Sequence, residues 1–142
     1  MTKKEFCEAL VKLREDNGYS KNAISKTTGL TFQAVLRIER GTSNYALIKP
    51  IDYLNAMGYH LEVEGRNTCA IIFEPADAIE WFKQTKGNLS ANALASVINV
   101  SPAMINFILS GKSSLTINVF LSICNYYNAT IKFVKNGRGT KY

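Results

Sequence analysis

The feature that most constrains this chain is an internal repeat. Helix-capping residues, apolar residues and a glycine of the first half recur 70 positions later without a gap. The matched residues are Ser20, Ala23, Ile24, Leu30, Thr31, Val35, Ile38 and Gly41 in the first half and Ser90, Ala93, Leu94, Val100, Ser101, Ile105, Ile108 and Gly111 in the second. The register continues through Leu61 and Val63, which match Ile131 and Phe133. So long an ungapped match predicts two tandem copies of one structural unit.

Residues 20–41 indicate what that unit contains. Ser20 is a good N-cap, because its hydroxyl can accept a hydrogen bond from a free backbone N–H at the start of a short helix. Gly29 permits the left-handed backbone that ends a helix, and Thr31 can cap a second helix that ends at Gly41. Two short helices joined by a tight glycine turn form a helix-turn-helix.

The same stretch resembles the DNA-binding domain of the lambda-repressor-like (Xre-type) family. The residues that carry the resemblance are Ile24, Gly29, Leu30, Thr31, Val35, Ile38, Glu39, Arg40 and Gly41. The resemblance implies a regulator that occupies a DNA operator, blocks or adjusts transcription, and needs no cofactor. It also implies an ion pair between Arg14, on the preceding helix, and Glu39, near the end of the recognition helix.

The segments that flank this first helix-turn-helix predict two further helices and a hairpin. Residues 3–16 and 46–57 carry apolar side chains at helical spacing. Residues 60–64 alternate apolar and charged side chains as a half-buried strand does, and residues 68–74 read as a second strand. A turn-like segment separates them, so we expect a hairpin.

The second half predicts the same order of elements. Residues 77–86 supply a first helix with Ile79 and Phe82 facing inward, and residues 129–135 form a last strand. We therefore expect a mainly α fold with a small β element: two lambda-repressor-like helix-turn-helix bundles, and a short antiparallel sheet from the strands that follow each repeat. The expected domains are residues 1–66 and residues 67–142, the second a diverged copy. Strands 59–64 and 130–135 could pair across a pseudo-two-fold within one chain, or two chains could form a homodimer.

The first copy carries the side chains expected to read DNA. In a helix-turn-helix the second helix enters the major groove, and its N-terminal residues meet base edges. Gln33 can form a bidentate pair with adenine, Arg37 can reach a guanine or a phosphate, and Phe32 can press on a thymine methyl group. The reading candidates are Thr31, Phe32, Gln33, Ala34 and Arg37, and the phosphate-binding candidates that flank the helix are Ser20, Lys21, Arg40, Thr42 and Ser43.

The second copy departs from this pattern. Its recognition helix has no arginine and no glutamine, and between Asn88 and Thr130 the only charged residue is Lys112. A helix-turn-helix without cations gains little from phosphate neutralisation. One reading is a surface that meets another protein through Met104, Phe107 and Leu109. The other is weak DNA reading, for which the candidates are Ser101, Ala103, Asn106, Ser110 and Lys112.

Composition excludes several classes of function. The net charge of +6 and the isoelectric point of about 9.3 fit a polyanionic partner. The three cysteines lack metal-ligand spacing and indicate reduced thiols in a cytoplasmic protein, and no apolar run reaches membrane-spanning length. His60 is the only histidine, and no catalytic triad, metal-ligand pattern or phosphate loop is present. We expect no enzyme activity, no catalytic or metal-binding residues and no cofactor.

Together these observations predict a sequence-specific transcriptional regulator whose partner is double-stranded DNA. The main alternative is an antitoxin-like or adaptor protein, whose second copy binds another polypeptide and whose DNA binding is secondary or lost.

Overall fold

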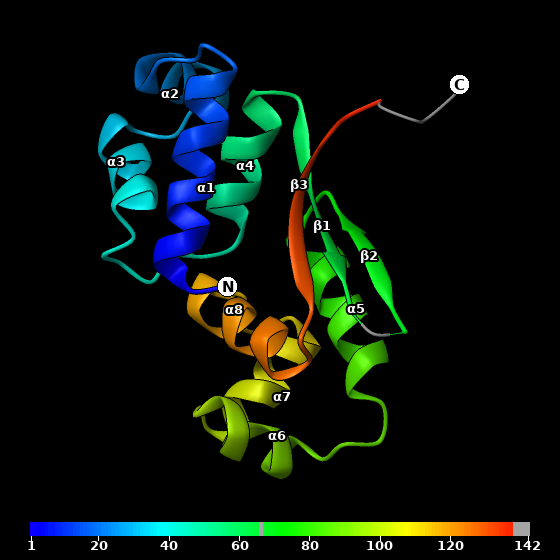
Figure 1. The fold of residues 1–142 in the computed structure, drawn as a ribbon. Coiled ribbons are helices and arrows are strands. Elements are labelled where there is room, and N and C mark those ends of the chain that lie inside the picture. The colour runs from blue at the N-terminus through cyan, green and yellow to red at the C-terminus, as the bar shows by residue number, and fades with distance from the viewer. Residues whose placement is uncertain (66, 138–142) are drawn as a thin grey trace.

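The computed structural model describes residues 1–65 and 67–137, and within them the chain forms eight helices and a three-stranded antiparallel sheet (Figure 1). In chain order the elements are α1 (Lys3–Asp16), α2 (Lys21–Thr28), α3 (Phe32–Arg40), α4 (Ile48–Ala56), β1 (Tyr59–Glu64), β2 (Cys69–Ile72), α5 (Pro75–Lys86), α6 (Ala91–Ile98), α7 (Pro102–Ser110), α8 (Ile117–Tyr126) and β3 (Thr130–Lys135). The mainly helical fold with a small sheet is as predicted.

The helix pairs α2–α3 and α6–α7 have bounds that differ by 70 residues at every end. Hydroxyl caps begin all four helices: Ser20 accepts a hydrogen bond from the Ala23 N–H, for example, and Thr31 accepts one from Ala34, at 3.0 and 3.1 Å. Both turns need a left-handed residue, which is Gly29 in the first half (φ 77°) and Asn99 in the second (φ 60°). The local rules that predicted these two units therefore hold in both.

The sheet has the strand order β2-β1-β3. The predicted hairpin of β1 and β2 forms, and so does the predicted pairing of β1 with β3. The prediction of a strand over residues 68–74 was too long, and the prediction that the next helix begins at residue 77 was too late. The carboxylate of Asp77 accepts hydrogen bonds from the N–H groups of Phe73 and Glu74, at 2.9 and 3.2 Å, which ends β2 and starts α5 at Pro75.

Two backbone contacts join the halves. In each of them, replacing every residue by its counterpart 70 positions away gives the same set of residue pairs. In the β1–β3 ladder Leu61 lies opposite Phe133, and Val63 lies opposite Ile131. In the second contact the N–H of Leu47 donates to the carbonyl of Leu115, and the N–H of Ile117 donates to the carbonyl of Tyr45, both at 2.8 Å. Ala46 and Thr116, also 70 apart, form the bridge between these two hydrogen bonds. This is the pairing that an approximate two-fold axis through both contacts would produce.

The buried core is continuous between the halves. Its largest fully buried side chains include Phe6, Tyr53, Trp81, Phe82 and Phe120, which come from α1, α4, α5 and α8. Phe82 is buried as predicted, whereas Ile79, which was also predicted to face inward, is only partly buried.

The two first helices are placed differently. α5 packs on β2, whereas the Phe6 ring of α1 meets the Phe133 ring of β3 edge-on, with centroids 5.5 Å apart. The division of the chain at residue 66 stays a prediction, and Arg66 lies outside the described residues.

Candidate nucleic-acid interface

Helix α3 turns its predicted reading side chains outward. Val35 and Ile38 are fully buried and hold the helix against the core. The rest of the predicted reading set lies on the other side: Thr31, Phe32, Gln33 and Arg37 are exposed, and Ala34 is half-buried. Phe32 is 40% exposed, so its ring is not packing inside the core. Because the buried residues Val35 and Ile38 lie on one side of α3, the opposite side is free to contact a ligand.

The acidic residue of α3 is withdrawn from that face. Glu39 receives hydrogen bonds from Arg14 Nε (2.7 Å), Arg14 Nη2 (3.2 Å) and the Tyr53 hydroxyl (2.6 Å). Burial opposes the charge of Arg14, but the hydrogen bonds and charge of Glu39 outweigh it and raise the pKa of Arg14. The predicted Arg14–Glu39 ion pair is confirmed. The outer face of α3 therefore presents Arg37 and Arg40 with no acidic side chain of its own helix beside them.

Tyr53 was missed by sequence reasoning, although it completes this buried network. The hydroxyl of Tyr53 also donates to the carbonyl of Leu10, at 3.4 Å. Burial, followed by the hydrogen bond to Glu39, raises the pKa of Tyr53. In the second half Ile123 occupies the position that corresponds to Tyr53. Gln84 and Leu109 occupy the positions that correspond to Arg14 and Glu39. Comparison of the three positions in the two halves would have indicated Tyr53 as a third member.

The predicted phosphate-binding residues flank α3 on three neighbouring segments. Ser20 and Thr42 are exposed, and Arg40 is exposed at the last residue of α3. Lys21 and Ser43 are partly buried. The hydroxyl of Ser20 accepts a hydrogen bond from the N–H of Ala23, and its own O–H can donate to a phosphate oxygen.

A further cation near this surface was not predicted. Lys3, in the first turn of α1, donates from Nζ to the carbonyl of Ser43 at 3.2 Å. It lies 40 residues away in the sequence, so no local pattern could associate it with the loop after α3.

Helix α7 presents a different outer face. Met104 and Phe107 are 38% and 45% exposed, and Ala103 and Asn106 lie exposed beside them. Ser101 Oγ caps α7, accepting from the N–H of Met104 at 3.1 Å, and its O–H can still donate. The remaining predicted candidates, Ser110 and Lys112, are exposed at the end of the helix, where Ser110 Oγ donates to the carbonyl of Phe107 at 3.1 Å.

Leu109 does not belong to this exposed face. It was predicted to share a protein-binding surface with Met104 and Phe107, but it is partly buried and packs against the core. Its position corresponds to that of Glu39, which also points inward. The structure therefore leaves Leu109 less accessible than Met104 and Phe107, and its role in a protein-binding surface stays a prediction.

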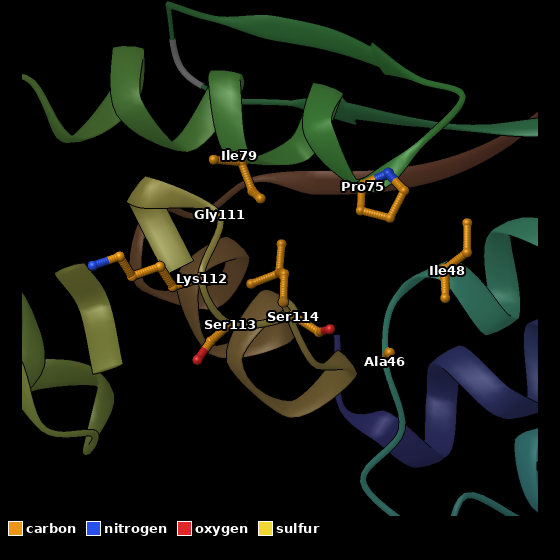
Figure 2. A pocket seen from close by; sticks show the side chains of 9 residues that line it. Ala46, Ile48, Pro75, Ile79, Gly111, Lys112, Ser113 and Ser114 are labelled. Atoms are coloured by element: carbon orange, nitrogen blue, oxygen red, sulfur yellow. The ribbon is translucent and has the colours of Figure 1, made fainter. Parts of the chain in front are cut away.

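A hollow of about 290 Å³ lies between the halves, next to the end of α7 (Figure 2). Ile48, Pro75 and Ile79 line it from α4 and α5, and the loop of residues 111–115 closes the other side. Lys112 is the charged residue among those that line this hollow, and Figure 2 shows its side chain extending away from the cavity. Ser113 and Ser114 also line the hollow, and the lining residues include no histidine and no carboxylate.

The remaining candidates for a metal centre in the described part of the chain are His60 and the cysteine and acidic side chains. His60 is buried, with Nδ1 2.6 Å from Asn136 Oδ1 and Nε2 2.7 Å from Glu62 Oε2. Among residues 1–65 and 67–137, no group of three or more His, Cys, Asp or Glu side chains is placed to hold a metal ion. In the same residues no single helix is long and apolar enough to cross a membrane; only α6 and α7 together pass that test, as a pair bent by 110°.

Comparison with known proteins identifies one of the two helix-turn-helix units. A family model described as Helix-turn-helix (HTH_3) matches residues 79–134, from within α5 into β3. No curated protein and no solved structure matches the chain. The match covers α6 and α7, whereas the resemblance was predicted first from α2 and α3. Residues 79–134 are thus a helix-turn-helix domain of the Xre type, a family that is typically non-enzymatic and has DNA as its partner.

Proposed function

We propose that this chain is a sequence-specific DNA-binding transcriptional regulator that inserts α3 into the major groove of its operator. The observation that carries the proposal is the outer face of α3, where Gln33 and Arg37 are exposed while Glu39 is held inside by Arg14. A carboxylate on that face would repel phosphates, so its withdrawal favours approach to DNA.

Each side chain of the proposed reading face has a role that its chemistry allows. The amide of Gln33 would pair with an adenine edge, and Arg37 would contact guanine or a phosphate. Phe32 and Ala34 would lie against thymine methyl groups. The flanking residues Ser20, Lys21, Arg40, Thr42 and Ser43 would hold the backbone phosphates, which fixes the position of α3 without reading sequence.

The proposal treats the chain as two copies of one unit, residues 1–66 and residues 67–142. The equal bounds of α2–α3 and α6–α7 after a shift of 70 residues support this division. The family match falls on the second copy, and the ion pair implied by the family occurs in the first.

A second function, binding of a protein partner in the manner of an antitoxin or adaptor, is favoured by one specific observation. Met104 and Phe107 of α7 are exposed apolar side chains on a helix that has no charged residue. Such side chains are common at protein interfaces. In this reading DNA binding would be secondary or lost.

Fluorescence anisotropy with a short random-sequence duplex tests the proposal. The unmodified protein, Arg37→Ala and Gln33→Ala are titrated across a salt series, and Lys83→Ala, which removes an exposed charge of α5, is the matched control. We expect affinity to fall steeply with salt, and Arg37→Ala to weaken binding and reduce the salt slope by about one if Arg37 contacts a phosphate. Gln33→Ala should leave random-sequence binding nearly unchanged and alter only sequence preference. Absence of binding by the unmodified protein at low salt would refute the regulator and leave the protein-partner function.

A further inference from the structure

We propose that a single chain acts as a built-in dimer, which reads one asymmetric two-part DNA site with α3 on one half-site and α7 on the other. This inference rests on the proposed function of α3 and adds the form of the site and the role of α7. Regulators that pair two identical helices read half-sites that mirror each other about the protein two-fold, with centres about 34 Å apart. Here the two helices belong to one chain and differ in sequence.

The contacts between the halves are those of a two-fold pair. Exchanging residues 70 apart maps the Leu61–Phe133 pair of the sheet onto the Val63–Ile131 pair. The same exchange maps the hydrogen bond from Leu47 to Leu115 onto that from Ile117 to Tyr45. Two separate contacts with the same exchange symmetry are what a two-fold axis between the halves would produce. Such an axis would relate α3 to α7 as the half-sites of an operator are related.

The second of these contacts follows directly after both recognition helices. Arg40, the last residue of α3, precedes Ala46 by six residues, and Ser110, the last residue of α7, precedes Thr116 by six. Six extended residues span at most about 21 Å on each side, and bridged residues lie about 5 Å apart, so the two helix ends lie within roughly 47 Å of each other. Figure 1 shows the two helix-turn-helix units at opposite ends of the molecule, with α8 between them. A separation of one DNA turn, about 34 Å, is compatible with both observations.

The outer face of α7 can contact base edges in the major groove through uncharged side chains. No acidic residue occurs between Asn88 and Thr130, so α6, α7 and α8 carry no carboxylate that would repel phosphates, and Lys112 adds a cation after α7. Asn106 can pair with adenine, and Ala103 and Phe107 can contact thymine methyl groups. The family that matches residues 79–134 has DNA as its partner, which favours DNA over a protein as the occupant of this face.

The two half-sites must then differ in sequence. At positions 70 apart, Gln33 corresponds to Ala103, and Arg37 corresponds to Phe107. The α3 half would be selected by polar, bidentate contacts and the α7 half by apolar contacts, which favour A·T pairs.

Selection from a random duplex library tests this with the full chain. The unmodified protein should enrich a site with two unlike halves whose centres lie about 10 base pairs apart. The double substitution Ala103→Gln, Phe107→Arg gives α7 the reading pair of α3, so its enriched site should approach an inverted repeat. Native mass spectrometry should find one chain on each enriched duplex. Phe107→Ala, the second and milder variant, should weaken binding to the complete site about tenfold and leave binding to the α3 half-site alone unchanged.

The outcomes separate this inference from the proposed function. Enrichment of a single half-site that neither α7 variant alters would overturn the inference. In that case α3 would be the only DNA-reading helix of the two, and the α7 face would be assigned to a protein partner. Two chains on each site would also overturn it. If the unmodified protein enriches nothing, the proposed function itself fails. Circular dichroism of both variants checks that they fold, as the exposure of Ala103 and Phe107 predicts.

Discussion

The buried network of Arg14, Glu39 and Tyr53 should stabilise the first half only while it is complete. The side chains of Arg14 and Glu39 are 10% and 7% exposed, and they form two parallel hydrogen bonds of 2.7 and 3.2 Å. Replacing Glu39 by leucine, the residue 70 positions later, leaves the guanidinium of Arg14 charged, buried and without its partner. Tyr53 loses its bond to Glu39 but keeps the carbonyl of Leu10 within 3.4 Å.

The magnitude follows from this geometry. Removing one partner of a buried ion pair costs about 3–5 kcal/mol, whereas replacing both by apolar side chains is often close to neutral. We therefore expect Glu39→Leu to lower the free energy of unfolding by about 3–5 kcal/mol, a large part of a typical total of about 5–15 kcal/mol. The double variant Arg14→Leu, Glu39→Leu should be more stable than Glu39→Leu alone, although it carries one more substitution.

Urea unfolding followed by far-ultraviolet circular dichroism measures these differences. With a slope of about 2 kcal/mol per molar urea, the midpoint of Glu39→Leu should fall by about 1.5–2.5 M. Glu15→Leu, which changes an exposed glutamate of α1, is the matched control and should shift the midpoint little. A loss below about 1 kcal/mol for Glu39→Leu, or a double variant no more stable than Glu39→Leu alone, would refute the reasoning.

Three further predictions concern glycine and cysteine positions. In thermal unfolding, Gly41→Ala should lower the free energy of unfolding by about 2–4 kcal/mol and Gly111→Ala by about 1–2 kcal/mol. Both glycines have positive φ, but only at Gly41 would an added Cβ also meet Cys7 Sγ, at 2.8 Å. Adding Cys7→Ala should recover the difference, and equal losses at both glycines would contradict this account. Cys69 is exposed and should react with a thiol reagent in the folded protein, whereas Cys7 and Cys124 should react only after unfolding, as mass spectrometry of the labelled chain can measure. Burial raises the pKa of Cys124 to about 12, so above about pH 9 the unfolded chain releases a proton that the folded chain keeps. Stability from this group is complete below pH 9 and should decline toward pH 12 by at most about 1.4 kcal/mol per unit, a decline that Cys124→Ala should reduce in urea titrations.

The helix-turn-helix units could be predicted from sequence because their signals are local. Ser20 and Thr31 lie three residues before the N–H groups that they cap, and Gly29 adopts the left-handed backbone that ends α2. The Arg14–Glu39 pair spans 25 residues, and the family resemblance supplied what spacing alone could not.

The parts that sequence did not predict depend on contacts between distant segments. β2 ends early because Asp77 binds two N–H groups upstream, and Tyr53 joins the ion pair only once α4 packs beside α3. Lys3 reaches Ser43 across 40 residues. The pairing of β1 with β3 within one chain is one of the two arrangements that the repeat left open.

The proposed pairing of α3 and α7 in one chain would let the two recognition helices differ in sequence. In a homodimer a single substitution alters both half-site contacts, whereas in the proposed built-in dimer α3 and α7 can differ, as Arg37 and Phe107 do. The link also removes the association step, in which two separate subunits lose translational and rotational freedom worth about 4–15 kcal/mol. The contacts at Ala46–Thr116 and between β1 and β3 form within the fold. A titration of the selected duplex should therefore be hyperbolic down to the lowest protein concentration that the assay detects. A sigmoidal curve at low concentration would indicate that two chains must pair first, and would remove the physical basis for an asymmetric site.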